Sequence, residues 1–314
     1  MNNTYRIVFM GTPDFSVPAL EALCDNGYTP IAVYTKPDRV NSRGKKIIFS
    51  PVKALARERN IPVYQPETFK TEEEIEKLKA LSPDLLVVVA YGKILPMSVL
   101  RIPTYGALNI HASLLPKYRG AAPVQRAIIN GDTETGVTIM RLDAGMDTGD
   151  IVSMTRCPIL QTTTAGDLFE TLSKTGALEL IRVLQDLEGS LAKARPQDHT
   201  QATYAEKVTK EMGLLRWQMP AGEMSCLIRG MSPNPGCYSF FRGSRVKIYD
   251  ALSEETSSSF TPGTIVSLDG GLIGVACGEG ILRIKVIQPE NHKKMSAAEF
   301  VNGYKVQCHD TFIS

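Results

Sequence analysis

The first 160 residues alternate short apolar runs with segments of helical spacing. Five runs have the length and composition of buried strands, at residues 6–11, 31–35, 85–90, 107–112 and 137–142. Between them, helical patterns are found at residues 16–27, 50–60 and 71–81. This order predicts an α/β domain with a doubly wound, mainly parallel sheet.

Helix signals agree with this pattern. Ser50 is placed to cap a helix whose first residue is Pro51, and the segment 71–81 has acidic residues in its first turn. Residues 163–189 repeat apolar positions at helical spacing, so we expect one long helix that packs across the sheet and closes the domain.

The chain becomes polar after Gly189 and regains a pattern near Glu211. We therefore predict a first domain at 1–189, a linker at 190–210 and a second domain at 211–314. The second domain has short strands with turn signals at Asp269-Gly270 and at 278–280, a pattern typical of hairpins. A small β-barrel of the oligonucleotide/oligosaccharide-binding (OB) type fits it best.

Composition excludes several classes. The 314 residues are 43% hydrophobic and 22% charged, as in an ordinary globular protein of two domains. We find no apolar run of the roughly 20 residues that a membrane span needs and no signal peptide before the first strand, so we expect a cytoplasmic protein without a membrane partner. The six cysteines are scattered without metal-site spacing, so no metal is expected. A net charge of +2 does not by itself indicate nucleic acid.

The segment "NIHASLLPKYRG" at 109–120 raises a chemical question. On a strand, Asn109 and His111 lie on one face, and two unpartnered polar side chains in a core would cost roughly 2–7 kcal/mol each. The carboxyl edge of a parallel sheet, where ligands bind, is the place we expect for them. A hydrogen-bonded core histidine is the alternative interpretation.

A second polar segment, "RLDAGMDTGD" at 141–150, follows the next strand and contains Asp143, Asp147 and Asp150. A calcium loop is excluded, because its twelfth position counted from Asp143 is Met154 rather than glutamate. A plain polar turn remains open. We expect this segment at the same sheet edge, where a carboxylate could orient His111.

An amide, an imidazole and a carboxylate without a nucleophile suit attack on a carbonyl by an external amine. Asn would stabilise the oxyanion, His would add to that stabilisation or move protons, and Asp would hold His or take a proton through water. The first turn, "GTPDFS", lacks the glycines of a dinucleotide site, and G-x-S-x-G is absent, which disfavours a dehydrogenase and a serine hydrolase.

Basic residues cluster at 35–46 and recur near the linker. They can wrap a phosphate backbone or can simply be solvated. They are Lys36, Arg39, Arg43, Lys45 and Lys46, followed by Lys207 and Lys210.

Several segments together closely resemble the methionyl-tRNA formyltransferase family, among the enzymes that use 10-formyltetrahydrofolate on a Rossmann-like fold. They are "NIHASLLPKYRGAAPVQRAIINGD", "TGVTIMRLDAGMDTGDI", "KPDR..SRGKK..SPVKALA", "VVVAYGKILP" and "YAEKVTKE". The resemblance covers nearly the whole chain and implies formyl transfer from 10-formyltetrahydrofolate to the α-amine of initiator methionyl-tRNA by a monomer. Within these enzymes, three features resemble the tRNA enzyme in particular: the basic loop, the linker lysines and the barrel.

The resemblance also implies residue roles. The catalytic residues are Asn109, His111 and Asp147, and the folate site is formed by Ser113, Leu114, Leu115, Pro116, Tyr91 and Gly92. The tRNA contacts are Arg39, Arg43, Lys45, Lys46 and Lys207, with the second domain on the tRNA backbone. A packing role for the "SLLP" turn and for the ring of Tyr91 is the alternative.

Two positions depart from the family pattern, Arg216 where Asp is usual and Asn234 where Trp is common, and both bear only on the second domain. Two other functions stay open. One is formylation of a different amine, such as a nucleotide-linked sugar or glycinamide ribonucleotide, and the other is an RNA-binding protein with an inactive folate fold.

Overall fold

The computed structural model describes residues 5–40, 47–256 and 258–314. It divides into two compact units. The first comprises Met1–Gly120, Gly136–Cys157 and Phe169–Tyr204, and the second comprises Ala121–Thr135, Pro158–Leu168 and Ala205–Ser314. The boundaries at residues 189 and 210 that we inferred from sequence stay predictions.

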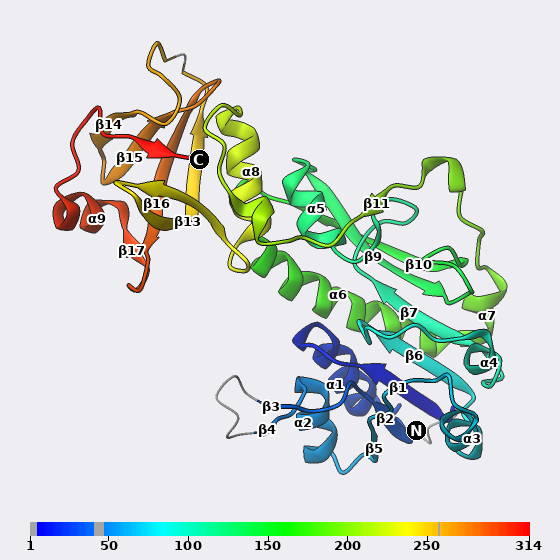
Figure 1. The fold of residues 1–314 in the computed structure, drawn as a ribbon. Helices are drawn as coiled ribbons and strands as arrows, with labels where there is room; N and C mark the ends of the chain where they lie inside the picture. The colour runs from blue at the N-terminus through cyan, green and yellow to red at the C-terminus, as the bar shows by residue number, and fades with distance from the viewer. Residues whose placement is uncertain (1–4, 41–46, 257) are drawn as a thin grey trace. The chain divides into compact units, whose positions relative to one another are not determined.

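A twisted sheet organises the first unit, with the strand order β10-β9-β7-β6-β1-β2-β5 among the described residues (Figure 1). Neighbours from β5 to β7 pair in parallel, which confirms the mainly parallel sheet, whereas β9 pairs antiparallel with β7. The strands are β1 (Ile7–Gly11), β2 (Ala32–Tyr34), β5 (Val63–Tyr64), β6 (Leu85–Val89), β7 (Ala107–His111), β9 (Glu134–Arg141) and β10 (Ile151–Pro158). Each of the five predicted strands is present.

The predicted helices are present as α1 (Val17–Asp25), α2 (Pro51–Glu58) and α3 (Glu72–Ala80), joined by the short α4 (Met97–Leu100). The Ser50 hydroxyl caps α2 by accepting from the Lys53 N–H at 3.1 Å, as predicted. The prediction of a single helix over 163–189 is wrong at its C-terminal end. It divides into α6 (Ala165–Gln185) and α7 (Leu187–Ala192), because the Asp186 side chain accepts from the Gly189 N–H and caps a new helix.

The two faces of the sheet are covered differently. A Cβ built on Gly176 of α6 would lie 2.6 Å from Ile110 and 3.3 Å from Val137, so α6 packs closely on the face that carries Ile110. On the opposite face, Ala107 belongs to an apolar core shared with Leu78 of α3 and Val99 of α4. Because side chains alternate along β7, Asn109 and His111 lie on this second face.

The second unit contains an antiparallel sheet in the order β14-β15-β16-β13-β12-β18, with β17 beside β16. Its two edges meet at the bridge between Thr264 and Thr311, which closes it as expected for an OB-like barrel. The strands are β12 (Cys237–Phe241), β13 (Ser244–Glu254), β14 (Ile265–Asp269), β15 (Leu272–Ala276), β16 (Ile281–Pro289), β17 (Met295–Ser296) and β18 (Phe312–Ile313).

Turns and helices complete this unit. Gly270 and Gly271 both have positive φ in the two-residue turn from β14 to β15, which confirms the predicted hairpin. Helix α8 (Ala221–Met231) packs on β13 and against α5 (Pro123–Ile129), and α9 (Ala297–Tyr304) packs on β15 and β16. Arg216, which precedes the buried Trp217 in the chain, is exposed, and so is Asn234.

The remaining short elements are β3 (Arg39–Val40) with β4 (Ile47–Ile48), β8 (Arg119–Gly120) with β11 (Tyr204–Ala205), and the 3₁₀ turns Asp14–Ser16, His199–Gln201 and Glu211–Gly213. A search of the described helices finds no segment with the length and apolar character of a membrane span.

Candidate functional site

Strand β7 presents Asn109 and His111 side by side near its carboxyl end. His111 is buried, with 5% of its surface exposed, and Asn109 is half-buried. Within residues 5–40, 47–256 and 258–314, no hydrogen bond to the Asn109 side-chain amide is present. Its N–H groups have no acceptor among these residues and can donate to a ligand at the edge of the site.

The hydrogen bonds of His111 fix its tautomer. Its Nε2 lies 2.9 Å from the main-chain oxygen of Tyr118, which can only accept, so Nε2 carries the hydrogen. The other nitrogen, Nδ1, lies 3.7 Å from Oδ1 of Asp147. In the neutral ring Nδ1 therefore has a lone pair that faces a carboxylate, and a proton taken up there would be stabilised by Asp147.

Asp147 reaches this position by an unexpected route. We predicted its loop at the same edge as His111 because both follow strands, but β9 is antiparallel to β7 and ends with Arg141 opposite Leu108. The chain then returns toward His111, where Asp147 has a left-handed φ of 53° and its Oδ2 accepts from the Gly120 N–H at 2.8 Å. The two residues are close, although the reason we gave was wrong.

Asp143, in the same loop, differs from Asp147. Asp143 accepts hydrogen bonds from Gly145 and Thr148 within its own turn and is exposed, so the polar-turn interpretation describes it well. Only Asp147, of the two, contacts the histidine.

The "SLLP" turn is held from β9. Thr138, opposite His111 in the sheet, donates its hydroxyl to the Ser113 carbonyl at 2.7 Å and accepts from the Leu115 N–H at 3.1 Å. The Ser113 hydroxyl donates to the Lys117 carbonyl, and Leu115 is buried, so both side chains stabilise the turn. Leu114 and Pro116 are half-buried.

Tyr91 and Gly92 follow β6 at the same edge. The Tyr91 ring is buried beside Phe69, as the packing alternative expects, and burial raises the pKa of its hydroxyl. Gly92 has a positive φ of 72°, and a Cβ built there would collide with Nζ of Lys36, so the Lys36 amine lies over this glycine.

The predicted tRNA contacts are only partly among the residues that the structure describes. Arg43, Lys45 and Lys46 lie outside the described residues, and for Arg39 the structure gives only the backbone, in β3. Lys207 is exposed in the second unit.

Sequence reasoning missed a polar group behind the site. Arg119, with 2% of its surface exposed, contacts Gln197 and His199, which we placed in the predicted linker at 190–210. The polar composition of 190–210 gave no signal for this burial. That Arg119 ends a motif loop was the only available hint.

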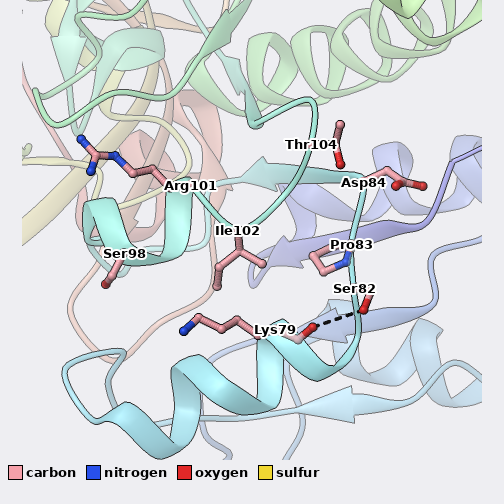
Figure 2. Close-up of a pocket in the computed structure, with 8 residues that line it drawn as sticks. All are labelled: Lys79, Ser82, Pro83, Asp84, Ser98, Arg101, Ile102 and Thr104. Carbon is pink, nitrogen blue, oxygen red and sulfur yellow. Dashed lines mark hydrogen bonds between the residues drawn. The ribbon is translucent and has the colours of Figure 1, made fainter.

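No group of three His, Cys, Asp or Glu residues that could hold a metal ion is found within the described ranges. A surface pocket of about 520 Å³ lies at the other edge of the sheet, lined by residues that precede β6 and β7, including Asp84 and Thr104 (Figure 2). Its Lys79 is paired with Glu76. This pocket shares no residue with the predicted site.

Comparison with known proteins identifies the class of protein to which this chain belongs. Residues 5–184 match the family model described as formyl transferase, and residues 207–305 match formyl transferase, C-terminal domain. An N-formyltransferase from Helicobacter canadensis, solved with folinic acid and dTDP-3-aminofucose, has the same fold with a TM-score of 0.66 at 20% identity, over 92% of this chain and 99% of that one. The chain belongs to the formyl transferase family.

Nearer relatives narrow the class. Methionyl-tRNA formyltransferase of Caldanaerobacter subterraneus is 46% identical over 96% of this chain and 97% of its own length. The protein of the same name from Acetivibrio thermocellus is 45% identical over 96% of this chain and 97% of its own. The chain is thus a formyl-transferring enzyme, in the group of formyl transferases whose curated members are methionyl-tRNA formyltransferases.

Proposed function

We propose that this enzyme transfers the formyl group of 10-formyltetrahydrofolate to the α-amino group of initiator methionyl-tRNA, with Asn109, His111 and Asp147 as its catalytic residues. The observation that carries the proposal is the contact of His111 Nδ1 with Asp147, beside an Asn109 amide whose N–H groups have no acceptor among the described residues. Names of relatives at 45–46% identity over nearly their full length support the substrate.

The chemistry follows from these positions. The neutral α-amine attacks the formyl carbon and forms a tetrahedral intermediate, whose oxyanion accepts a hydrogen bond from the Asn109 amide. Such a donor typically contributes about 2.7–4 kcal/mol to the transition state. The amine loses one proton to His111 Nδ1, either directly or through water, and Asp147 stabilises the resulting imidazolium.

Collapse of the intermediate completes the transfer. The bond from the formyl carbon to N10 of the folate breaks, the carbonyl re-forms, and the imidazolium returns its proton to N10. The products are N-formylmethionyl-tRNA and tetrahydrofolate. No nucleophile from the protein is needed, which agrees with a site that offers an amide, an imidazole and a carboxylate.

The folate is proposed to bind along the "SLLP" turn and the segment at Tyr91 and Gly92, which border β7 and β6. The turn is suited to this because Thr138 fixes its backbone from β9. Folinic acid bound to the similarly folded Helicobacter canadensis enzyme supports a folate-type donor. Neither a metal nor oligomerisation enters the proposed mechanism, and a monomer in the cytoplasm stays our prediction from sequence.

The tRNA is proposed to contact the basic segment through Arg39, Arg43, Lys45 and Lys46, and the second unit through Lys207. Arginine and lysine on phosphates make such binding salt-dependent. An OB-like barrel suits a contact of this kind, since strand faces and loops of this fold commonly bind oligonucleotides.

A label-transfer assay tests the function. The enzyme is incubated with 10-formyltetrahydrofolate labelled in the formyl carbon and with initiator or elongator methionyl-tRNA. We expect label in acid-precipitable initiator tRNA, with much less in the elongator. Label that instead enters an amino sugar or glycinamide ribonucleotide but not tRNA would contradict the proposal.

A further inference from the structure

Gln197 is a buried amide with every hydrogen-bonding group in use. Its side-chain nitrogen donates to the main-chain oxygens of Asp147, at 2.9 Å, and of Gly149, at 2.7 Å. Its oxygen accepts from Nε and Nη2 of Arg119, at 3.1 Å and 2.6 Å. Because arginine only donates, the amide has one possible orientation, with the oxygen toward Arg119 and the nitrogen toward the loop of Asp147.

This amide holds a backbone that few residues adopt. Asp147 has a φ of 53°, in the left-handed region that disfavours non-glycine residues. That conformation places Oδ2 on the Gly120 N–H and Oδ1 near His111. The two bonds from Gln197 fall on the carbonyls of Asp147 itself and of the residue two positions later, so they fix the segment from which the carboxylate projects.

The other end of Gln197 is anchored just behind His111. Arg119 is buried, and its guanidinium also contacts Nδ1 of His199 at 3.0 Å. The main-chain N–H of Arg119 donates to the Thr203 carbonyl at 2.8 Å. The residue before it, Tyr118, supplies the oxygen that binds His111 Nε2. Gln197 therefore joins the loop that orients the imidazole to the loop that carries the carboxylate.

We infer that Gln197 is a positioning residue of the formyl transfer, which holds Asp147 at its distance from His111. The inference rests on the catalytic role proposed above for Asp147. Gln197 does not contact the substrates in the proposed mechanism. Its loss should therefore lower kcat and leave the KM for each substrate nearly unchanged. A displacement of about 1 Å in a catalytic group can cost about 100-fold in rate.

The substitution Gln197→Glu tests this with little change in volume. It keeps an acceptor for Arg119 but replaces both N–H donors with an oxygen that faces the carbonyls of Asp147 and Gly149. We expect kcat to fall about 10- to 100-fold, with KM for folate and tRNA within about twofold of wild type. Gln201→Glu is the matched control. Gln201 is exposed in the same segment and donates to Asp198, and this variant should keep wild-type kcat.

A double-mutant cycle with Asp147→Asn separates positioning from general damage. If Gln197 acts through the Asp147 carboxylate, Gln197→Glu should lower kcat by less than about twofold in the Asp147→Asn background. An equal loss in both backgrounds, or wild-type kcat for Gln197→Glu alone, would overturn the inference while leaving the proposed function intact. Wild-type activity of Asp147→Asn alone would instead remove the role of Asp147, and the inference with it.

A second variant covers the case in which Gln197→Glu does not fold. Gln197→Met has similar volume and removes the donors without adding a negative charge. The same cycle with Asp147→Asn should give the same non-additive loss of kcat, and an additive loss would overturn the inference.

Discussion

His111 donates its Nε2 hydrogen to the main-chain oxygen of Tyr118 across 2.9 Å. This bond makes the loop after β7 responsible for the chemistry of the ring, because it leaves Nδ1 as the nitrogen that exchanges protons beside Asp147. The backbone of the loop at Tyr118 thus selects the tautomer of His111, and the loop of Asp147 supplies the carboxylate beside it.

The first prediction concerns that tautomer. When the His111 ring is neutral, nitrogen-15 NMR of labelled histidine should show its hydrogen on Nε2 and a lone pair on Nδ1. The spectrum of His111→Gln assigns the signal among the four histidines of the chain. A hydrogen found on Nδ1 would mean that the Tyr118 bond is absent in solution.

A second prediction concerns the packing of α6 on β7. Gly176→Val would place side-chain carbons within the space of Ile110 and Val137, and we expect the free energy of unfolding to fall by about 1–3 kcal/mol. Leu178→Val, at an exposed position on the same helix, should change it by less than about 0.5 kcal/mol. Urea denaturation followed by circular dichroism measures both. Equal small effects would show that α6 does not pack this closely.

The stability of the second unit should depend on alkaline pH through Cys277. Burial raises the pKa of this thiol from 9.0 to about 11. Between these values the unfolded chain has released the proton and the folded chain has kept it, so stability is complete below pH 9 and falls as the pH rises toward 11. Urea denaturation at several pH values should show a smaller fall for Cys277→Ala. Cys308→Ala, at an exposed thiol, should match wild type, and parallel curves for all three proteins would refute the burial of Cys277.

The basic segment gives a fourth prediction, made from the sequence because Arg43 and Lys45 lie outside the described residues. Replacing both with Ala should weaken tRNA binding. It should also lower the slope of log affinity against log salt concentration by about 0.7–0.9 for each lost phosphate contact. Filter binding over a salt series measures this. Lys174→Ala, on α6, removes one exposed charge and should leave the slope unchanged. An unchanged slope in the double variant would favour the solvated interpretation.

Much of the sheet could be predicted because its strands are continuous apolar runs, such as 85–89, and its helices have local caps such as Ser50. The direction of β9 could not, since an apolar run has the same appearance whichever way it pairs. The break before α7 was missed because Asp186 interrupts an apolar pattern that continues on both sides.

The candidate site also contains residues that could be predicted from the sequence and one that could not. Asn109 and His111 could be predicted from alternation along one strand, which is local information. Gln197 could not, since its burial depends on Arg119, 78 residues earlier in the chain, and on the carbonyls of a returning loop. Residues that act through tertiary hydrogen bonds leave no periodic pattern in a sequence.

The central claim is that the side chains on this face of β7 perform the transfer. Single-turnover formylation of initiator methionyl-tRNA by Asn109→Ala and by His111→Ala measures it most directly, alongside tRNA affinity. We predict that each variant slows the chemical step about 100- to 1,000-fold while binding tRNA as tightly as wild type does. Formylation at the wild-type rate by both variants would contradict the account.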